Sequence, residues 1–60
     1  MTIDIEALRR DLINYFGTAM SFNPMAVMDL TKVEKASPEE LVDIAQDNGF
    51  NLEDYQIITL

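Results

Sequence analysis

The sequence predicts an all-α fold, and three observations support this. Apolar residues recur at intervals of three and four through much of the chain, as they do on one face of a helix. A capping residue followed by proline occurs twice, at Asn23 and at Ser37. Asn48 and Gly49 form a helix-stop signal after the second of these starts. We therefore expect residues 1–60 to form a single helical domain, a small bundle of three main helices plus a short C-terminal helix.

The first helix is expected to begin after a cap at Thr2 or Asp4 and to run to about residue 17. Gly17 leaves two alternatives open. It can stop the helix in the left-handed conformation after Phe16, or it can lie inside a longer helix and allow another backbone to approach closely. The apolar row of this helix contains Ile5, Leu8, Leu12, Tyr15 or Phe16, and Ala19.

The second helix is expected to begin with Asn23 as its cap and Pro24 at its first position, where a missing N–H has no cost. Its apolar sector is wider than a single core-facing stripe. The sector consists of Met25, Ala26, Val27, Met28, Leu30 and Val33. Such a sector can fill a core with adaptable methionines, or it can leave a patch exposed that pairs with another chain.

The third helix has the clearest boundaries. Ser37 and Glu40 form a capping box, in which the serine and a glutamate three residues later satisfy free N–H groups reciprocally. Gly49 is expected to end the helix in the left-handed conformation, with Phe50 folding back on the last turn. The inward row is Leu41, Ile44 and Ala45, with Val42 beside it.

A short final helix is expected after a cap at Asn51, with Leu52 and Tyr55 facing inward. The tail from Gln56 is apolar and β-branched, and it can extend this helix or run as an extended segment. Ile58, Thr59 and Leu60 can also add as a strand to a sheet edge, or pack against the third helix.

The small size of the chain favours association with another copy. A chain of 60 residues buries a small core that rarely supplies more than about 3–5 kcal/mol. The absence of cysteine and histidine excludes disulfides and ordinary zinc sites as additional stabilisation. Because 48% of the residues are nevertheless hydrophobic, we expect a homodimer, the commonest symmetric assembly.

The charge of −7 excludes several classes of function. An acidic surface repels phosphate backbones and anionic membranes, so direct binding of nucleic acid or of a membrane is not expected. Catalysis, a metal and a cofactor are not expected either, because the usual catalytic bases and phosphate-binding loops are missing. Asp4 and Glu6 interrupt the position where a signal peptide would be apolar, and no stretch is long enough to span a bilayer. These features together predict a cytoplasmic protein.

Two groups of residues are candidates for an interaction surface. Glu39, Asp43 and Asp47 are four residues apart and so form one acidic row on the third helix, either as an ordinary solvated face or as a docking stripe for a basic partner. The second group is apolar and contains Phe22, Met25 and Met28.

Residues 36–55 resemble the C-terminal part of the nitrogen-fixation-associated and nitrile-hydratase-type leader-like peptides, small helical proteins of bacteria. The shared residues are Pro38, Glu39, Glu40, Leu41, Ala45, Gly49 and Phe50. In that family the helical segment is a recognition handle for modifying enzymes, ahead of a Gly-Gly cleavage site that the two separated glycines do not reproduce. The resemblance therefore implies a role in protein recognition.

The function that the sequence predicts is that of a small acidic, non-enzymatic protein–protein interaction module, an adaptor or regulator of bacterial or phage type. Two alternatives stay open. One is a nucleic-acid mimic that inhibits a basic enzyme by occupying its groove. The other is a leader-like recognition domain.

Overall fold

The computed structural model describes residues 2–57, and within this range the protein is mostly helical. Its elements in order are β1 (Thr2–Ile3), α1 (Ile5–Ala19), α2 (Ala26–Lys35), α3 (Pro38–Asp47), the 3₁₀-helix η1 (Leu52–Tyr55) and β2 (Gln56–Ile57). Three main helices and a short C-terminal helix were expected, and this part of the prediction is confirmed. The strand pair was not expected.

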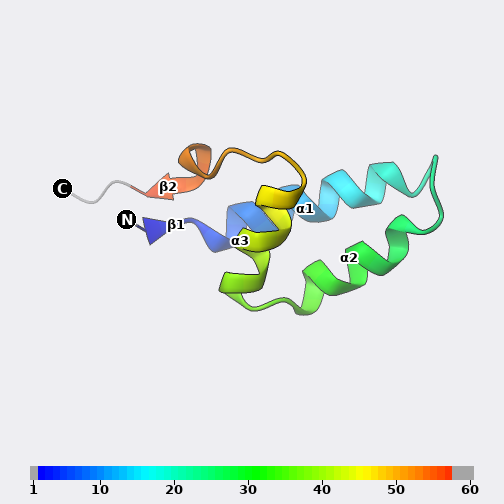
Figure 1. Cartoon of the computed structure of the whole chain (residues 1–60), viewed down its shortest axis with the longest axis horizontal. Helices are drawn as coiled ribbons and strands as arrows, with labels where there is room; N and C mark the ends of the chain where they lie inside the picture. The colour runs from blue at the N-terminus through cyan, green and yellow to red at the C-terminus, as the bar shows by residue number, and fades with distance from the viewer. Residues whose placement is uncertain (1, 58–60) are drawn as a thin grey trace.

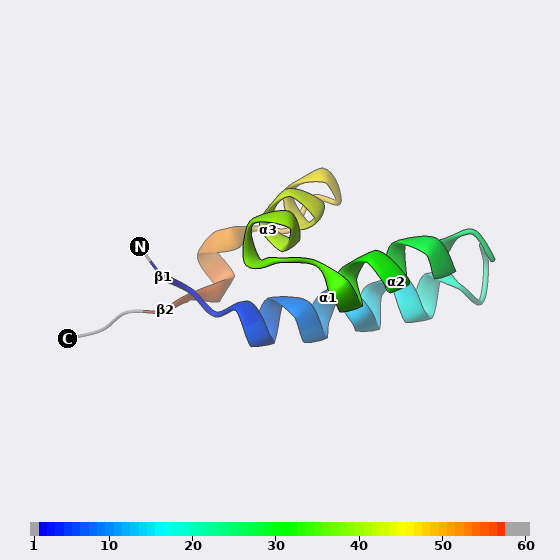
Figure 2. The same cartoon turned by 90° about the horizontal axis from the view of Figure 1, so that it is seen from below.

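Helices α1 and α2 form an antiparallel hairpin, and α3 lies across the end of the hairpin nearest the N-terminus (Figures 1 and 2). The result is an elongated body of 42 × 18 × 16 Å. The core lies where the three helices meet and consists of Leu8, Leu12, Phe16, Val33, Ala36, Leu41 and Ala45. The turn between α1 and α2 therefore projects beyond most of the core.

The two strands close the molecule at the end opposite the hairpin turn (Figure 1). They pair antiparallel, with Thr2 opposite Ile57 and Ile3 opposite Gln56. The Asp4 backbone N–H also donates to the Tyr55 carbonyl oxygen at 2.6 Å. Of the two conformations that the sequence left open for the tail, residues 56 and 57 adopt the extended one. The predicted roles of Ile58, Thr59 and Leu60 lie outside the described residues.

Helix α1 differs from its predicted boundaries at the C-terminal end. Asp4 caps it, because its side chain accepts from the Ala7 backbone N–H at 3.1 Å, whereas Thr2 belongs to β1. The helix continues through Gly17 to Ala19, and a Cβ placed on Gly17 would meet no atom within 4 Å. Gly17 is therefore not a left-handed stop. It lies inside a longer helix, as the second alternative predicted, but no other segment of the described chain approaches it closely. The cost of an interior glycine, about 1 kcal/mol, is too small to end a helix by itself.

Helix α2 begins later than predicted. The Asn23 side chain accepts from the Met25 backbone N–H at 3.1 Å, so this asparagine does cap a turn. The first bonds are of 3₁₀ type, from Ala26 N–H to the Asn23 oxygen and from Val27 N–H to the Pro24 oxygen. The α-helix therefore starts at Ala26 and not at Pro24, after one tight turn.

Helix α3 confirms the predicted start and stop. The Ser37 hydroxyl oxygen accepts from the Glu40 N–H at 3.3 Å, which is one half of the predicted capping box. The Glu40 carboxylate accepts from the Ser37 hydroxyl at 3.1 Å, and not from a backbone N–H as the box predicts. Gly49 has φ of +80°, and Phe50 N–H donates to the Ala45 oxygen at 2.9 Å. This bond and the one from Gly49 N–H to the Gln46 oxygen form a Schellman motif. The final helix is capped by Asn51 as expected, but it is a single 3₁₀ turn.

Candidate interaction surfaces

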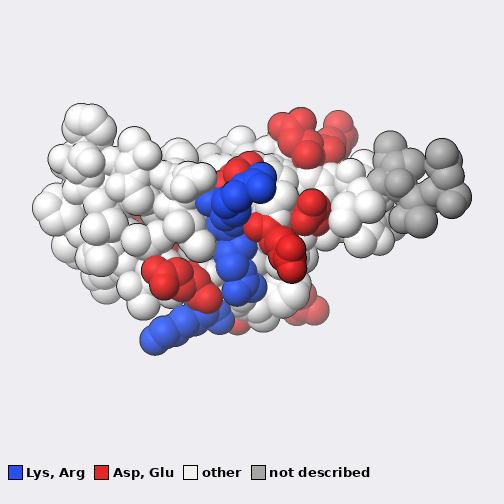
Figure 3. All heavy atoms as spheres, turned by 180° about the vertical axis from the view of Figure 1, so that it is seen from behind, with Lys and Arg blue, Asp and Glu red and all other residues white. Residues whose placement is uncertain are grey.

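The hairpin turn lies in a segment without charge. All 15 charged residues lie outside residues 12–28, a stretch that contains the second half of α1, the turn and the start of α2. Figure 3 shows the consequence, since the end of the molecule that holds the turn is almost free of acidic and basic atoms on this face. Charge repulsion is therefore weakest at this end of an otherwise acidic protein.

Large apolar side chains are exposed at this end. Phe22 is 87% exposed, Met25 64% and Met28 55%. Val27 at 44% and Met20 at 37% adjoin them in sequence. We call these five residues, Met20, Phe22, Met25, Val27 and Met28, the apolar tip. The three apolar residues that the sequence singled out all belong to it.

The apolar tip is exposed because a small residue of α2, and not one of its large apolar residues, faces α1. The inward position of the first turn of α2 is Ala26, which is buried at 4% exposure and fills little space. Residues 25, 27 and 28 lie on other sides of the same turn, so their larger side chains point away from the core. Part of the wide apolar sector predicted for this helix is thus core, through Ala26 and Val33, and part is surface.

The acidic row on α3 is exposed along its length, because Glu39, Asp43 and Asp47 all face solvent. Two lysines of α2 lie close to it. Lys32 and Lys35 line the same shallow hollow as Asp43, and Lys32 also lies beside Asp47. Figure 3 shows basic atoms gathered in a band across the middle of the body, with acidic atoms on both sides. The row is therefore partly neutralised by its neighbours, which the sequence did not indicate.

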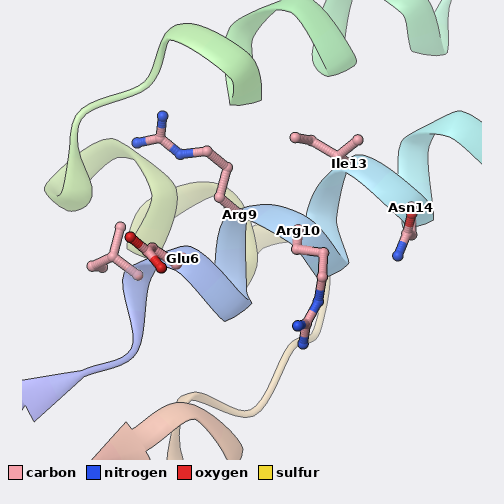
Figure 4. A pocket seen from close by; sticks show the side chains of 6 residues that line it. Glu6, Arg9, Arg10, Ile13 and Asn14 are labelled. Carbon is pink, nitrogen blue, oxygen red and sulfur yellow. The ribbon is translucent and has the colours of Figure 1, made fainter.

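Arg9 has a structural contact that the sequence did not indicate. Its guanidinium donates to the Ala36 carbonyl oxygen at 2.8 Å and to the Glu34 oxygen at 3.4 Å, so it covers the free carbonyls at the C-terminal end of α2. Figure 4 shows Arg9 reaching toward the α2–α3 link while Arg10 points away from it. The hollow drawn there is lined by residues of α1 alone, so it is an open helix face and not an enclosed site.

Tyr55 and Asp11 join η1 to α1. The Tyr55 hydroxyl donates to Asp11 Oδ2 at 2.6 Å, and Arg10 Nε contacts the other oxygen, Oδ1, at 3.3 Å. The hydrogen bond from Tyr55 is the main reason that the pKa of Asp11 lies below its usual value. The same bond to Asp11, with burial as a smaller cause, raises the pKa of Tyr55 to about 12.

An aromatic groove lies beside this hydrogen bond. Tyr15 packs edge-on against Phe50, with ring centroids 5.4 Å apart and an interplanar angle of 86°. Tyr15 also contacts Phe16 edge-on at 5.1 Å. One hollow, which we call the aromatic groove, is lined by Tyr15, Phe50, Tyr55 and the α1 residues Asp11, Asn14, Thr18 and Ala19. No sequence pattern within α1 predicted it, because its walls come from segments far apart in the chain.

The six residues predicted for interaction thus lie on two separate surfaces. Three are on the apolar tip and three are on α3, at the other end of the hairpin. The structure does not bring them together into one site.

Comparisons with models of known protein families, with curated proteins and with solved structures find no match to this chain. The resemblance of residues 36–55 to leader-like peptides therefore stays a prediction. None of the helices in residues 2–57 combines the length and the apolar composition needed to cross a bilayer.

Proposed function

We propose that this protein is a non-enzymatic protein–protein interaction module of the cytoplasm that pairs with a second copy of itself through the apolar tip. One observation supports this above the others: five large apolar side chains are exposed together at an uncharged end of a small acidic chain. Large apolar side chains exposed close together in the chain are typical of sites that bind another protein.

The distribution of charge favours a second copy as the occupant. Two molecules of charge −7 repel each other across most of their surfaces. Contact between their tips keeps the acidic helices at opposite ends of an elongated dimer, because α3 lies at the far end of the hairpin from the turn. A two-fold axis through the tips also lets the same residues pair with each other, which is the commonest form of homodimer.

The available area is sufficient for a weak dimer. With roughly 200 Å² for a fully exposed large side chain, the exposed fractions of the five tip residues correspond to about 500–600 Å² per copy. Two copies would then bury about 1,100 Å², which is near the lower limit for a specific interface. We therefore expect a dimer that dissociates on dilution.

A tip-to-tip dimer leaves the acidic row free. Glu39, Asp43 and Asp47 would be displayed at both ends of the assembly, where they can attract a basic protein. The protein would thus act as an adaptor or regulator with two copies of an acidic surface. The lysines beside the row reduce its field, so this contact is weaker and more sensitive to salt than the contact between tips.

Sedimentation equilibrium over a series of concentrations tests the dimer. Wild-type protein is expected to approach the dimer mass at the highest concentrations, and Met25→Asp to remain a monomer. Met25 is exposed and lies at the N-terminal end of α2, where a negative charge is favourable, so this variant is expected to fold. Gln46→Glu adds the same charge on α3 and serves as the matched control, with dimerisation unchanged.

Salt gives a second readout. Dimerisation through uncharged surfaces should persist or strengthen as salt screens the repulsion between two acidic chains. A wild-type protein that stays monomeric at every concentration, or a Met25→Asp variant that dimerises as well as wild type, would show that the tip does not pair copies.

The second candidate function is mimicry of nucleic acid on a basic enzyme, favoured by the exposure of three carboxylates one helical turn apart. Charge reversal in the double variant Asp43→Lys, Asp47→Lys distinguishes it. Inhibition of a basic nucleic-acid enzyme that disappears in this variant and at high salt would support mimicry, and equal inhibition by Met25→Asp would exclude a contribution from the tip.

A further inference from the structure

We propose that the aromatic groove binds a lysine or arginine side chain of a basic peptide. The groove is a shallow, open hollow between one face of α1 and the segment that contains Phe50 and Tyr55. None of the five residues of the apolar tip lines it. The inference rests on the proposed function in one respect, the basic character of the partner.

The lining of the groove suits a cation. Three of the residues that line it are aromatic, one is an aspartate, and none is a lysine or arginine. Aromatic ring faces attract cations, at solvent-exposed sites as well as at buried ones. Tyr15 is 46% exposed, so its ring is accessible to a ligand, and its perpendicular contact with Phe50 holds two rings at a right angle. A methylene chain with a charged end fits such a lining better than an anion or a neutral polar group.

Asp11 supplies the charge that an aromatic lining lacks. The 2.6 Å hydrogen bond from the Tyr55 hydroxyl fixes the orientation of its carboxylate through Oδ2. The other oxygen contacts Arg10, whose side chain is 69% exposed. Exposed pairs of this kind contribute little, so an incoming cation can replace Arg10 at low cost. A carboxylate has about four acceptor positions, which leaves room for a second donor beside Tyr55.

The negative charge of the protein favours the approach of a cation to the groove. The protein has a net charge of −7, so a basic peptide is attracted from a distance. Asp54 of η1 directly precedes Tyr55 in sequence and Glu53 lies one position earlier, and the charge of Asp54 reaches the Tyr55 hydroxyl. A basic peptide therefore meets attraction at long range, and the aromatic rings with Asp11 then select one of its side chains.

The test is a titration of isotope-labelled protein, followed by amide chemical shifts. The probe is a short capped peptide of alternating arginine and alanine, and the control is the same peptide with glutamate in place of arginine. Shifts caused by the arginine peptide are expected in residues 11–19 and 50–55. Tyr15→Leu is expected to weaken binding about fivefold, because it removes one ring and keeps an apolar side chain.

Two variants that each remove one negative charge distinguish binding in the groove from general electrostatic attraction. Asp11→Asn removes a carboxylate inside the groove, and Asp47→Asn removes one on α3. We expect the first to weaken binding about tenfold and the second less than twofold. Because Asp11→Asn also alters the contact with Tyr55, a thermal melt checks its fold, and Tyr15→Leu gives an independent measure.

Each other outcome is informative. Binding that shifts the amide signals of α3 and depends on Asp43 and Asp47 would overturn the proposal for the groove. It would show that the acidic row is the surface that binds the basic peptide. Equal effects of Asp11→Asn and Asp47→Asn, with no effect of Tyr15→Leu, would show diffuse electrostatic attraction and also overturn it. Absence of binding would remove the basic partner altogether, while dimerisation through the tip would be unaffected.

Discussion

The two ends of the α1–α2 hairpin differ in almost every physical respect. At the end covered by α3, Leu8, Leu12 and Leu41 are fully buried, and caps begin and end the helices. At the apolar tip, Phe22 and two methionines are more than half exposed, and residues 12–28 contain no charged residue. The covered end supplies the stability of the fold, whereas the tip has side chains whose burial requires another molecule. In a chain this small, the amount of apolar sequence alone therefore does not tell which end of the hairpin is core and which is exposed surface.

The largest expected contrast is between Leu12→Ala and Phe22→Ala. Leu12 has no exposed surface, so its truncation leaves a cavity and should cost about 2–5 kcal/mol. A core of this size supplies only about 3–5 kcal/mol, so this variant should be largely unfolded. Phe22→Ala should change the free energy of unfolding by less than about 0.5 kcal/mol. Urea denaturation followed by circular dichroism, at protein concentrations where wild type is monomeric, measures both. A large loss of monomer stability in Phe22→Ala would show that the tip belongs to the core.

The next contrast is between alanine substitutions at the two glycines, which we expect to change the stability of the protein in opposite directions. Gly49 has φ of +80°, so Gly49→Ala should cost about 1–2 kcal/mol. Gly17 lies inside α1 with open space around a Cβ, so Gly17→Ala should stabilise the protein by up to about 1 kcal/mol. Urea midpoints of the two variants against wild type test this. Effects of the same sign would contradict the assigned helix boundaries.

The last contrast concerns the hydrogen bond between Tyr55 and Asp11 and is seen as a function of pH. The pKa of Tyr55 is raised from 10.0 to about 12, so the folded state favours the neutral hydroxyl. The resulting stabilisation is complete below pH 10.0 and is lost as the pH rises to about 12. The pKa of Asp11 is lowered, mainly by Tyr55, so its stabilisation is present above 3.8 and is lost as the pH falls below that value.

The difference in stability between wild type and Tyr55→Phe should therefore be constant at neutral pH and decrease toward both extremes. Thermal melts at a series of pH values measure it, and ultraviolet titration of Tyr15→Phe reports the ionisation of Tyr55 alone. A constant difference from neutral pH to pH 12 would show that the bond does not form in solution.

The parts of the fold that could be predicted from the sequence depend on local chemistry. Ser37 and Gly49 act within one helical turn of themselves, and both have the conformations that their neighbours indicated. The end of α1 could not be predicted, because the modest penalty of Gly17 competes with the continued hydrogen bonding of the helix. The first residue of α2 could not be predicted either, because Asn23 caps a 3₁₀ turn before the α-helix begins.

The candidate site could be predicted only in part, for a related reason. The width of the apolar sector on α2 left an exposed patch as one of two alternatives, but it did not indicate that Ala26 would take the inward position. Arg9 contacts Ala36 across 27 positions of the sequence, and Tyr55 contacts Asp11 across 44 positions. A single sequence gives no periodic signal for contacts of this range. The aromatic groove depends on the second of these contacts and was missed for that reason.

The pairing of β1 with β2 places residues 2 and 57 side by side. In a variant trimmed to residues 2–57, a short peptide linker between these two positions would close the backbone into a ring, and the entropy of the unfolded chain would fall. The same closure permits a circular permutation with new ends in the turn between α1 and α2. That permuted protein would keep its core and lose the continuity of its apolar tip, so folding and self-recognition could be measured in separate molecules.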